Sequence, residues 1–508
     1  MRTSNSIKNS IIGTLTIFIS MVTSFIAQAV FIRILSIDFL GLNGLFTNIL
    51  SILSLFELGI GNAIIYNLYS PLAKKNKEEI NSLMCFYKKS YHIIAILILI
   101  CGVLILPFLN FIVRDVEVDI NIYIVYILFL LSSVASYIIS YKRSLIYADQ
   151  KNYIINIIHM AYLIILNISQ LLALYFTKNY YLYLIIKILY QLFENIVITV
   201  CANRLYPYLK DKKVKKLDKE IEQNIFLKIK ALVFHKIGAV IINGTDNIII
   251  SAFFTIGIVG IYSNYYMIIN AINIMFTQII SSCMASVGNL LVTSDKQNIY
   301  YTFRRIRFLN FWISSFSAIS LLCMIQPFII IWVGKEYLLG GEVVIILVFN
   351  YFQKMQRCTY STFKDSAGIW QEDKYVPLIE SFFNILFSIV CLKYFGLSGV
   401  FMGTIISGLV LWCYSYPRFV YKKLFNRHYL AYFVETLGYI LLFIIATVIT
   451  TSICVVFTVN NSLIQIIING IICIIVPNLL LFIFFKKTEN FRYFSKLISG
   501  NFNKILKR

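Results

Sequence analysis

A succession of long apolar segments constrains the fold of this chain more than any other feature. A helix needs about 20 mostly apolar residues to cross a bilayer, and fourteen runs of that kind occur in the sequence. They begin near residues 11, 41, 90, 121, 153, 181, 232, 261, 308, 343, 377, 397, 431 and 463. Their periodicity is helical, without the ten-residue alternation of a membrane barrel. We therefore predict an all-α integral membrane protein with about 14 transmembrane helices.

The composition agrees with this prediction. Hydrophobic residues make up 59% and charged residues 13% of the 508 positions, whereas soluble proteins average about half apolar and a quarter charged. The net charge of +22 raises nucleic-acid binding as an alternative. The distribution of the positive charges along the chain decides between the two explanations.

Lys and Arg concentrate in alternate loops. If the N-terminus is inside, 37 of the 45 basic residues lie on the inner side and three lie within spans. The outer set is Arg33, Arg114, Lys178, Lys335 and Lys393. This asymmetry follows the positive-inside rule. It predicts a multi-pass protein of the cytoplasmic (inner) membrane with both termini in the cytoplasm. The basic inner loops are expected to contact anionic membrane lipids. A nucleic-acid-binding surface is then not needed to explain the positive charge.

The residues that usually build metal or catalytic sites are dispersed. Ten Cys are scattered singly through or beside the spans without a CxxC pair, and the four His are isolated. Neither a disulfide framework nor a metal site follows from this pattern. His, Cys and carboxylates do not cluster in one loop, so we do not expect an enzyme, a catalytic residue or a cofactor.

Two pairs of loop segments indicate an internal repeat. Residues 36–41 (SIDFLG) resemble residues 255–260 (TIGIVG) at an offset of 219, and residues 149–151 (DQK) resemble 372–374 (EDK) at an offset of 223. Because six helices separate the copies, the copies share one orientation, as in parallel transporter repeats. Two six-helix lobes around a central cavity are therefore expected, with a C-terminal helix pair added.

The predicted organisation has five parts. They are an N-terminal six-helix lobe (1–201), a basic cytoplasmic linker (202–231), a C-terminal six-helix lobe (232–416), the additional helices 13 and 14 (417–485) and a basic cytoplasmic tail (486–508).

The tenth apolar run contains polar residues at a depth where charge is costly. A charge at the bilayer centre costs about 2.5–3.5 kcal/mol on insertion scales, yet this run contains Gln353, Lys354 and Arg357. The two cations lie one helical turn apart and could hold a diphosphate. Alternatively, they extend to the inner interface or pair with Glu57 and Asp246.

Further intramembrane residues are candidates for transport or for helix packing. Asp246 and Glu57 are ion-coupling candidates, and Asn270 and Asn273 lie on a polar stripe that could line a hydrated path or pack between helices. Lys187 and Glu194 share one face of the sixth run and are predicted to form a structural or lumen charge pair. Glu380 and Glu435 fall near the inner boundary and are expected at the interface.

Several segments resemble one family of transporters. RILSIDFLGLNGLFTNILSILSLFELGIGNAI (33–64), TDNIIISAFFTIGIVGIYSNYYMI (245–268), KDSAGIWQEDKYVPLIES (364–381) and YFGLSGVFMGTIIS (394–407) are similar to segments of the polysaccharide-biosynthesis (Wzx-type) oligosaccharide flippases of the MOP exporter superfamily. The resemblance covers about residues 5–485 and is spread over the chain.

The resemblance implies a MATE-like fold and a function. Such a flippase would move undecaprenyl-diphosphate-linked oligosaccharide repeat units across the membrane by alternating access, for O-antigen or capsule synthesis, alongside a polysaccharide polymerase and chain-length proteins. Na⁺ or H⁺ could supply the coupling. Arg33, Lys354 and Arg357 would be the lumen cations and Asp246 the coupling acid. The alternatives are a cation-coupled multidrug exporter of the same superfamily and a membrane polymerase or glycosyltransferase.

Overall fold

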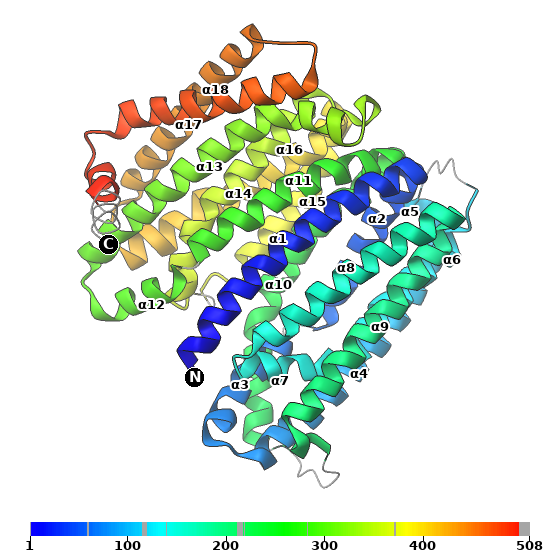
Figure 1. Cartoon of the computed structure of the whole chain (residues 1–508). Coiled ribbons are helices and arrows are strands. Elements are labelled where there is room, and N and C mark those ends of the chain that lie inside the picture. The colour runs from blue at the N-terminus through cyan, green and yellow to red at the C-terminus, as the bar shows by residue number, and fades with distance from the viewer. Residues whose placement is uncertain are drawn as a thin grey trace, which may run out of the picture. The chain divides into compact units, whose positions relative to one another are not determined.

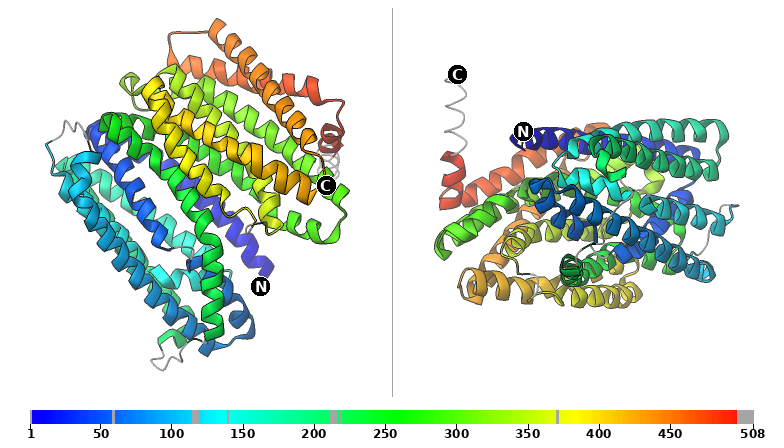
Figure 2. Two further views of the ribbon diagram at one scale, coloured as in Figure 1. Left: turned by 180° about the vertical axis from the view of Figure 1, so that it is seen from behind. Right: turned by 90° about the horizontal axis from the view of Figure 1, so that it is seen from below.

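The protein is helical in the computed structural model (Figures 1 and 2), which describes residues 2–57, 60–113, 119–138, 140–210, 217, 219–281, 283–369 and 372–496. No strand occurs among these residues. Parts of the predicted linker (211–216 and 218) and of the basic tail (497–508) lie outside the described residues. The chain divides into two compact units, residues 1–263 and 264–508.

Unit 1 consists of helices with short interruptions. Its elements are α1 (Arg2–Ile34), α2 (Ile37–Leu53), the 3₁₀-helix η1 (Ser54–Glu57), α3 (Ile60–Lys74), α4 (Lys77–Ile105), η2 (Leu106–Phe108), α5 (Leu109–Ile112), α6 (Ile122–Ile138), η3 (Ser140–Lys142), α7 (Arg143–Ala148), α8 (Asn152–Thr177), α9 (Tyr180–Leu205), η4 (Pro207–Lys210), α10 (Lys219–Phe253) and the first residues of α11 (Ile256–Ser281). Neighbouring pairs include α1 with α8, α8 with α9, α6 with α9, and α10 with α2.

Unit 2 is organised around one long helix. It contains the rest of α11, then α12 (Met284–Thr293), α13 (Lys296–Trp332), η5 (Lys335–Tyr337), α14 (Gly341–Ser366), α15 (Val376–Phe395), α16 (Leu397–Val410), the π-helix η6 (Leu411–Leu424), α17 (Tyr429–Val456) and α18 (Ser462–Phe485). The central helix α13 packs against α14, α17 and α18, while α15 and α16 pack closely against each other.

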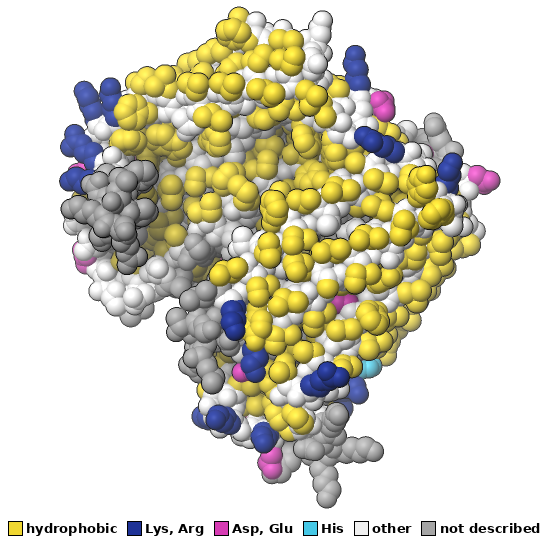
Figure 3. All heavy atoms as spheres, viewed as in Figure 1, with side chains coloured by type: hydrophobic (Ala, Val, Ile, Leu, Met, Phe, Trp, Pro, Cys, Tyr) yellow, Lys and Arg dark blue, Asp and Glu magenta, His cyan; other side chains and the backbone are white. Residues whose placement is uncertain are grey.

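Large apolar side chains cover the outward faces of several helices in each unit. Leu172 of α8 and Phe193 of α9 are exposed, as are Val448 of α17 and Ile474 of α18. In Figure 3 hydrophobic side chains spread over these helices, and Lys and Arg gather near helix ends. A surface of this kind is stable in contact with lipid rather than water.

All fourteen predicted runs lie in helices. Among the described residues, ten helices are long and apolar enough to cross a membrane, and a bent helix pair, Ile122–Ile138 with Ser140–Ala148, adds an eleventh if it is one span. The other three predicted runs belong to α10, α11 and α14, which carry the candidate residues Asp246, Asn273 and Arg357. The all-α membrane fold is confirmed, and the count of fourteen spans remains a prediction.

The two copies of the first repeat segment contact each other within unit 1. A Cβ on Gly41 would lie 2.1 Å from the carbonyl oxygen of Ile256, and a Cβ on Gly260 would lie 2.4 Å from that of Ile37. The pairs 41 with 260 and 37 with 256 both have the predicted offset of 219. The contact is therefore reciprocal, as expected for two related segments that cross around a local twofold axis.

The copies of the second repeat segment form ion pairs of their own. In unit 1 Asp149 Oδ2 lies 2.7 Å from Lys151 Nζ. In unit 2 Glu372 pairs with Lys423, and the ammonium of Lys423 lowers the pKa of the Glu372 carboxyl from its usual value. The two ion pairs differ, because Lys151 lies inside the first segment and Lys423 outside the second. The second repeat and the assignment of spans to the two predicted six-helix lobes remain predictions.

The glycine crossing gives a prediction about stability. Gly41→Ala and Gly260→Ala should each lower the free energy of unfolding by about 1–3 kcal/mol, because a methyl group there overlaps a backbone carbonyl. Gly438→Ala is the matched control, since nothing lies within 4 Å of a Cβ at that helical position and alanine favours helix by about 1 kcal/mol. Thermal unfolding in detergent measures the three variants, and equal midpoints would contradict the reciprocal contact.

Candidate functional site

Arg357 of α14 is held by an ion pair inside unit 2. Its Nη1 donates to Glu380 Oε1 of α15 at 2.6 Å, and its Nη2 lies 3.5 Å from Gln353 Oε1. Glu380 is only 4% exposed. A Cβ on Gly408 of α16 would lie 2.0 Å from Nη2, so a larger residue there would require the guanidinium to move.

This pair corrects two expectations. The carboxylate that neutralises Arg357 comes from the neighbouring helix α15, whereas the sequence suggested Glu57 or Asp246. Glu380, expected at the membrane interface, is buried against the arginine. The surroundings of Lys354 differ, because its side chain is exposed. The sequence spacing alone could not distinguish these two environments.

Arg307 of α13 forms a second buried site that the sequence did not indicate. The charge pattern predicts that the segment RRIR (304–307) lies on the inner side of the membrane, yet Arg307 is 2% exposed. Its Nη1 donates to Glu435 Oε2 at 2.8 Å and to the hydroxyl oxygen of Tyr421 at 2.6 Å. Its guanidinium lies 4.8 Å from the ring centre of Tyr439. Glu435, expected at the interface, is thus a partner of this arginine.

An apolar cavity of about 200 Å³ in unit 2 is lined by Arg307 and by Gln353, the neighbour of Arg357. The cavity is lined by residues of α13, α14, α16, η6 and α17: Arg307, Phe349, Phe352, Gln353, Gln356, Ile405, Leu409, Trp412, Cys413, Tyr432, Phe433, Thr436, Leu437, Tyr439 and Ile440. Arg307, Gln353 and Gln356 form its polar floor, since each is less than 9% exposed. Leu409 and Leu437 are 47% and 57% exposed, so these apolar residues lie at its outer edge.

Both arginines have a buried Nε. Nε of Arg307 and Nε of Arg357 have no hydrogen-bond partner in the part of the chain that the structure describes, and neither atom is accessible to solvent. A buried N–H without an acceptor is costly. The cavity combines an apolar opening with Arg307 in its lining, and a cation beside apolar groups suits an apolar chain that carries an anionic group.

Unit 1 contains a separate polar site around Glu57. This residue ends η1, immediately before residues 58 and 59, which lie outside the described residues. Its Oε1 accepts from the hydroxyl of Tyr91 at 2.9 Å, and its Oε2 lies 3.3 Å from Nζ of Lys236 on α10. Because α2 gives way to a 3₁₀ turn there, the carboxylate lies at a break in the helix, as at the ion sites of discontinuous transporter helices.

The remaining candidates are placed separately. Asp246 of α10 and Asn270 and Asn273 of α11 are half-buried, whereas Arg33 in the last turn of α1 is exposed. The side chain of Asn243 lies outside the described residues. Whether these residues line a path for substrate or ions remains a prediction.

Lys187 and Glu194, predicted as a structural or lumen charge pair, each have partners on other helices. Glu194 is 5% exposed and its Oε1 lies 3.0 Å from Arg143 Nη2 and 2.9 Å from His159 Nδ1. Lys187 lies over the ring of Phe129, 5.3 Å from its centre. Residues seven apart lie on one face but two turns from each other, so contacts with neighbouring helices determined both environments.

Comparison with solved structures gives the class of fold. A structure described as "Lipid II flippase MurJ, inward closed conformation" has a TM-score of 0.67 and 16% identity, covering 93% of this chain and 98% of that chain. An inward-facing MATE family multidrug resistance transporter of the MOP superfamily has a TM-score of 0.60 and 11% identity, and the match covers 77% of this chain and 91% of that chain. A mutant of the Vibrio cholerae MATE transporter VcmN has a TM-score of 0.56 and 11% identity, and the match covers 81% of this chain and 96% of that chain. The fold is that of the MOP transporters.

The family is identified from the sequence match. The model of the family described as "Polysaccharide biosynthesis protein" matches residues 6–284, more than half of the chain. The chain therefore belongs to the polysaccharide biosynthesis protein family. No curated protein sequence matches it.

The Arg357–Glu380 pair gives the second prediction. Arg357→Gln or Glu380→Gln should each lower stability by about 3–5 kcal/mol, because the remaining partner is a buried, uncompensated charge. The double variant should lie closer to the wild type than the sum of the single effects. Lys354→Gln is the control on the same helix, since that side chain is exposed. A double-mutant cycle of thermal stability measures the coupling, and simple additivity would contradict the pair.

Proposed function

We propose that this protein is a flippase for undecaprenyl-diphosphate-linked oligosaccharide repeat units. It would carry them across the bacterial cytoplasmic membrane for O-antigen or capsule synthesis. The family match and the fold shared with the lipid II flippase and MATE transporters support this proposal. The observation that carries it is the cavity of unit 2, in which an apolar opening and the cationic residue Arg307 occur together.

The chemistry of a prenyl diphosphate suits this cavity. At about 200 Å³ it is smaller than typical pockets for drug-sized ligands, which measure about 300–1,000 Å³. It would therefore take a segment of a prenyl chain, while the rest stays in lipid. A phosphate group at the cavity would lie near the guanidinium of Arg307, whose charge Glu435 already balances. Such a site holds the lipid without a large excess of positive charge.

The remaining parts of the mechanism are proposed on the same basis. Two arrangements of the helices would alternate, exposing the headgroup first to the cytoplasm and then to the outer side. Lys354, Arg357, Gln353, Asn270 and Asn273 of unit 2 are the proposed contacts of the headgroup, and Arg33 is proposed as a further substrate-binding cation in unit 1. Asp246 and Glu57 are the proposed sites of Na⁺ or H⁺ coupling, since each is a carboxylate within the helices of unit 1. The positive-inside pattern supports cytoplasmic termini.

The main rival is a cation-coupled multidrug exporter, because MATE transporters share the fold. The two functions differ in what accumulates when the protein is absent. Loss of a flippase leaves lipid-linked repeat units at the inner leaflet, whereas loss of a drug exporter leaves them unchanged. A membrane enzyme that makes or joins sugars would change their structure rather than their leaflet.

Filling the cavity tests the proposed site. In a strain that lacks the chromosomal gene, Leu409→Trp should lower surface polysaccharide at least tenfold relative to wild type and raise lipid-linked repeat units at the inner leaflet. The indole would occupy the outer edge of the cavity. Leu430→Trp is the control, since Leu430 is 65% exposed on α17 and is not among the lining residues.

The readout is surface polysaccharide at equal protein levels. Normal polysaccharide with Leu409→Trp would contradict the role of the cavity. Normal polysaccharide in the strain without any copy of the protein would contradict the function itself, so the two failures are distinguishable.

A further inference from the structure

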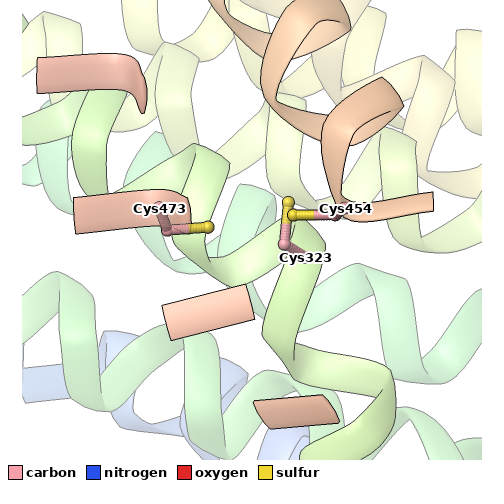
Figure 4. Close-up of side chains that lie close together, drawn as sticks. All are labelled: Cys323, Cys454 and Cys473. Atoms are coloured by element: carbon pink, nitrogen blue, oxygen red, sulfur yellow. The ribbon is translucent and has the colours of Figure 1, made fainter. Parts of the chain in front are cut away.

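Three cysteines that are far apart in the sequence meet inside unit 2. Cys323 of α13, Cys454 of α17 and Cys473 of α18 are all buried, and their Sγ atoms lie within 4.8 Å of one another. Figure 4 shows the three side chains, which come from three helices and point toward a common centre. The sequence predicted no such group, because the residues are far apart along the chain. Cys323 lies more than one hundred positions before Cys454, and Cys454 lies nineteen positions before Cys473.

The surroundings hold the cluster in place. Asn469, one turn before Cys473 on α18, donates from Nδ2 to the carbonyl oxygen of Cys323 at 2.7 Å. Gln465 donates to Asn469 Oδ1 at 2.7 Å and accepts from the backbone N–H of Val459 at 2.6 Å. This chain of buried hydrogen bonds joins the α17–α18 loop to α13. The three helices are thereby fixed around the sulfur atoms.

The donor set selects the type of metal ion. Within the described residues the group contains sulfur ligands only, with no His or carboxylate. Soft thiolate ligands favour Cu(I) or zinc, but structural zinc is almost always four-coordinate. With metal–sulfur bonds of about 2.3 Å, the length of zinc–thiolate bonds, three sulfurs around one ion lie about 4 Å apart. The cluster is therefore close to the size of a three-coordinate site.

We propose that Cys323, Cys454 and Cys473 bind one Cu(I) ion in a trigonal site. Binding breaks the three S–H bonds and forms three metal–sulfur bonds, because the thiolate rather than the thiol is the metal ligand. Three protons leave to solvent as one monovalent cation enters, and no electron is transferred. The ion would tie α17 and α18 to α13, away from the cavity of unit 2.

The test uses the full-length protein in detergent, reduced and kept under anaerobic conditions. Cu(I) is titrated in competition with a chromophoric Cu(I) chelator. We expect one equivalent to be retained by the wild type. Cys323→Ser, Cys454→Ser and Cys473→Ser should each weaken binding at least tenfold. X-ray absorption of the loaded protein should show sulfur ligands only.

Cys391→Ser is the matched control, because Cys391 is buried to the same extent as Cys323 but lies on α15, outside the cluster. It should bind like the wild type. Thermal unfolding without metal identifies variants that fail to fold, and Cys→Ala at the same positions provides a second series.

Three outcomes would overturn the proposal. They are equal Cu(I) affinity in the wild type and all cluster variants, a preference for Zn²⁺ over Cu(I), and a disulfide within the cluster that persists after treatment with the reductant.

Discussion

Neutralisation of buried charge is the constraint on which the interior of this protein depends. A charged side chain among membrane helices must find an opposite charge or polar partners nearby. Arg357 meets Glu380, Arg307 meets Glu435, and Glu194 meets Arg143, each through a neighbouring helix. These contacts set how the helices are rotated, and the rotation decides which residues face the cavity of unit 2.

The same constraint bears on the proposed binding of an anionic lipid in that cavity. An uncompensated arginine would bind a diphosphate tightly but would be expensive to bury and slow to release it. An arginine that is already paired binds an anion at a smaller electrostatic cost. A transporter needs binding of this kind, because the substrate must leave on the other side.

The sequence predicted the helices well and their contacts poorly, for physical reasons. Apolar periodicity and length reflect local chemistry, so the runs near 232 and 343 could be placed even with Asp246 and Arg357 inside them. The partner of a charge depends on helix rotation and packing, which no spacing encodes. Arg307 was missed because it follows two surface-like arginines, and the three cysteines were missed because their convergence is entirely tertiary. The first repeat could be recognised because residues 37 and 41 match residues 256 and 260 at one offset in the sequence, and the structure brings these segments into contact.

The most direct measurement of the central claim is transbilayer movement in proteoliposomes that contain only this protein. The substrate is a prenyl-diphosphate-linked oligosaccharide with a fluorescent sugar, and a membrane-impermeant quencher reports the fraction in the outer leaflet. The account predicts that the quenchable fraction changes with time at a rate proportional to the amount of protein, while ethidium does not move. Transport of ethidium driven by a cation gradient, with the lipid-linked sugar immobile, would contradict it.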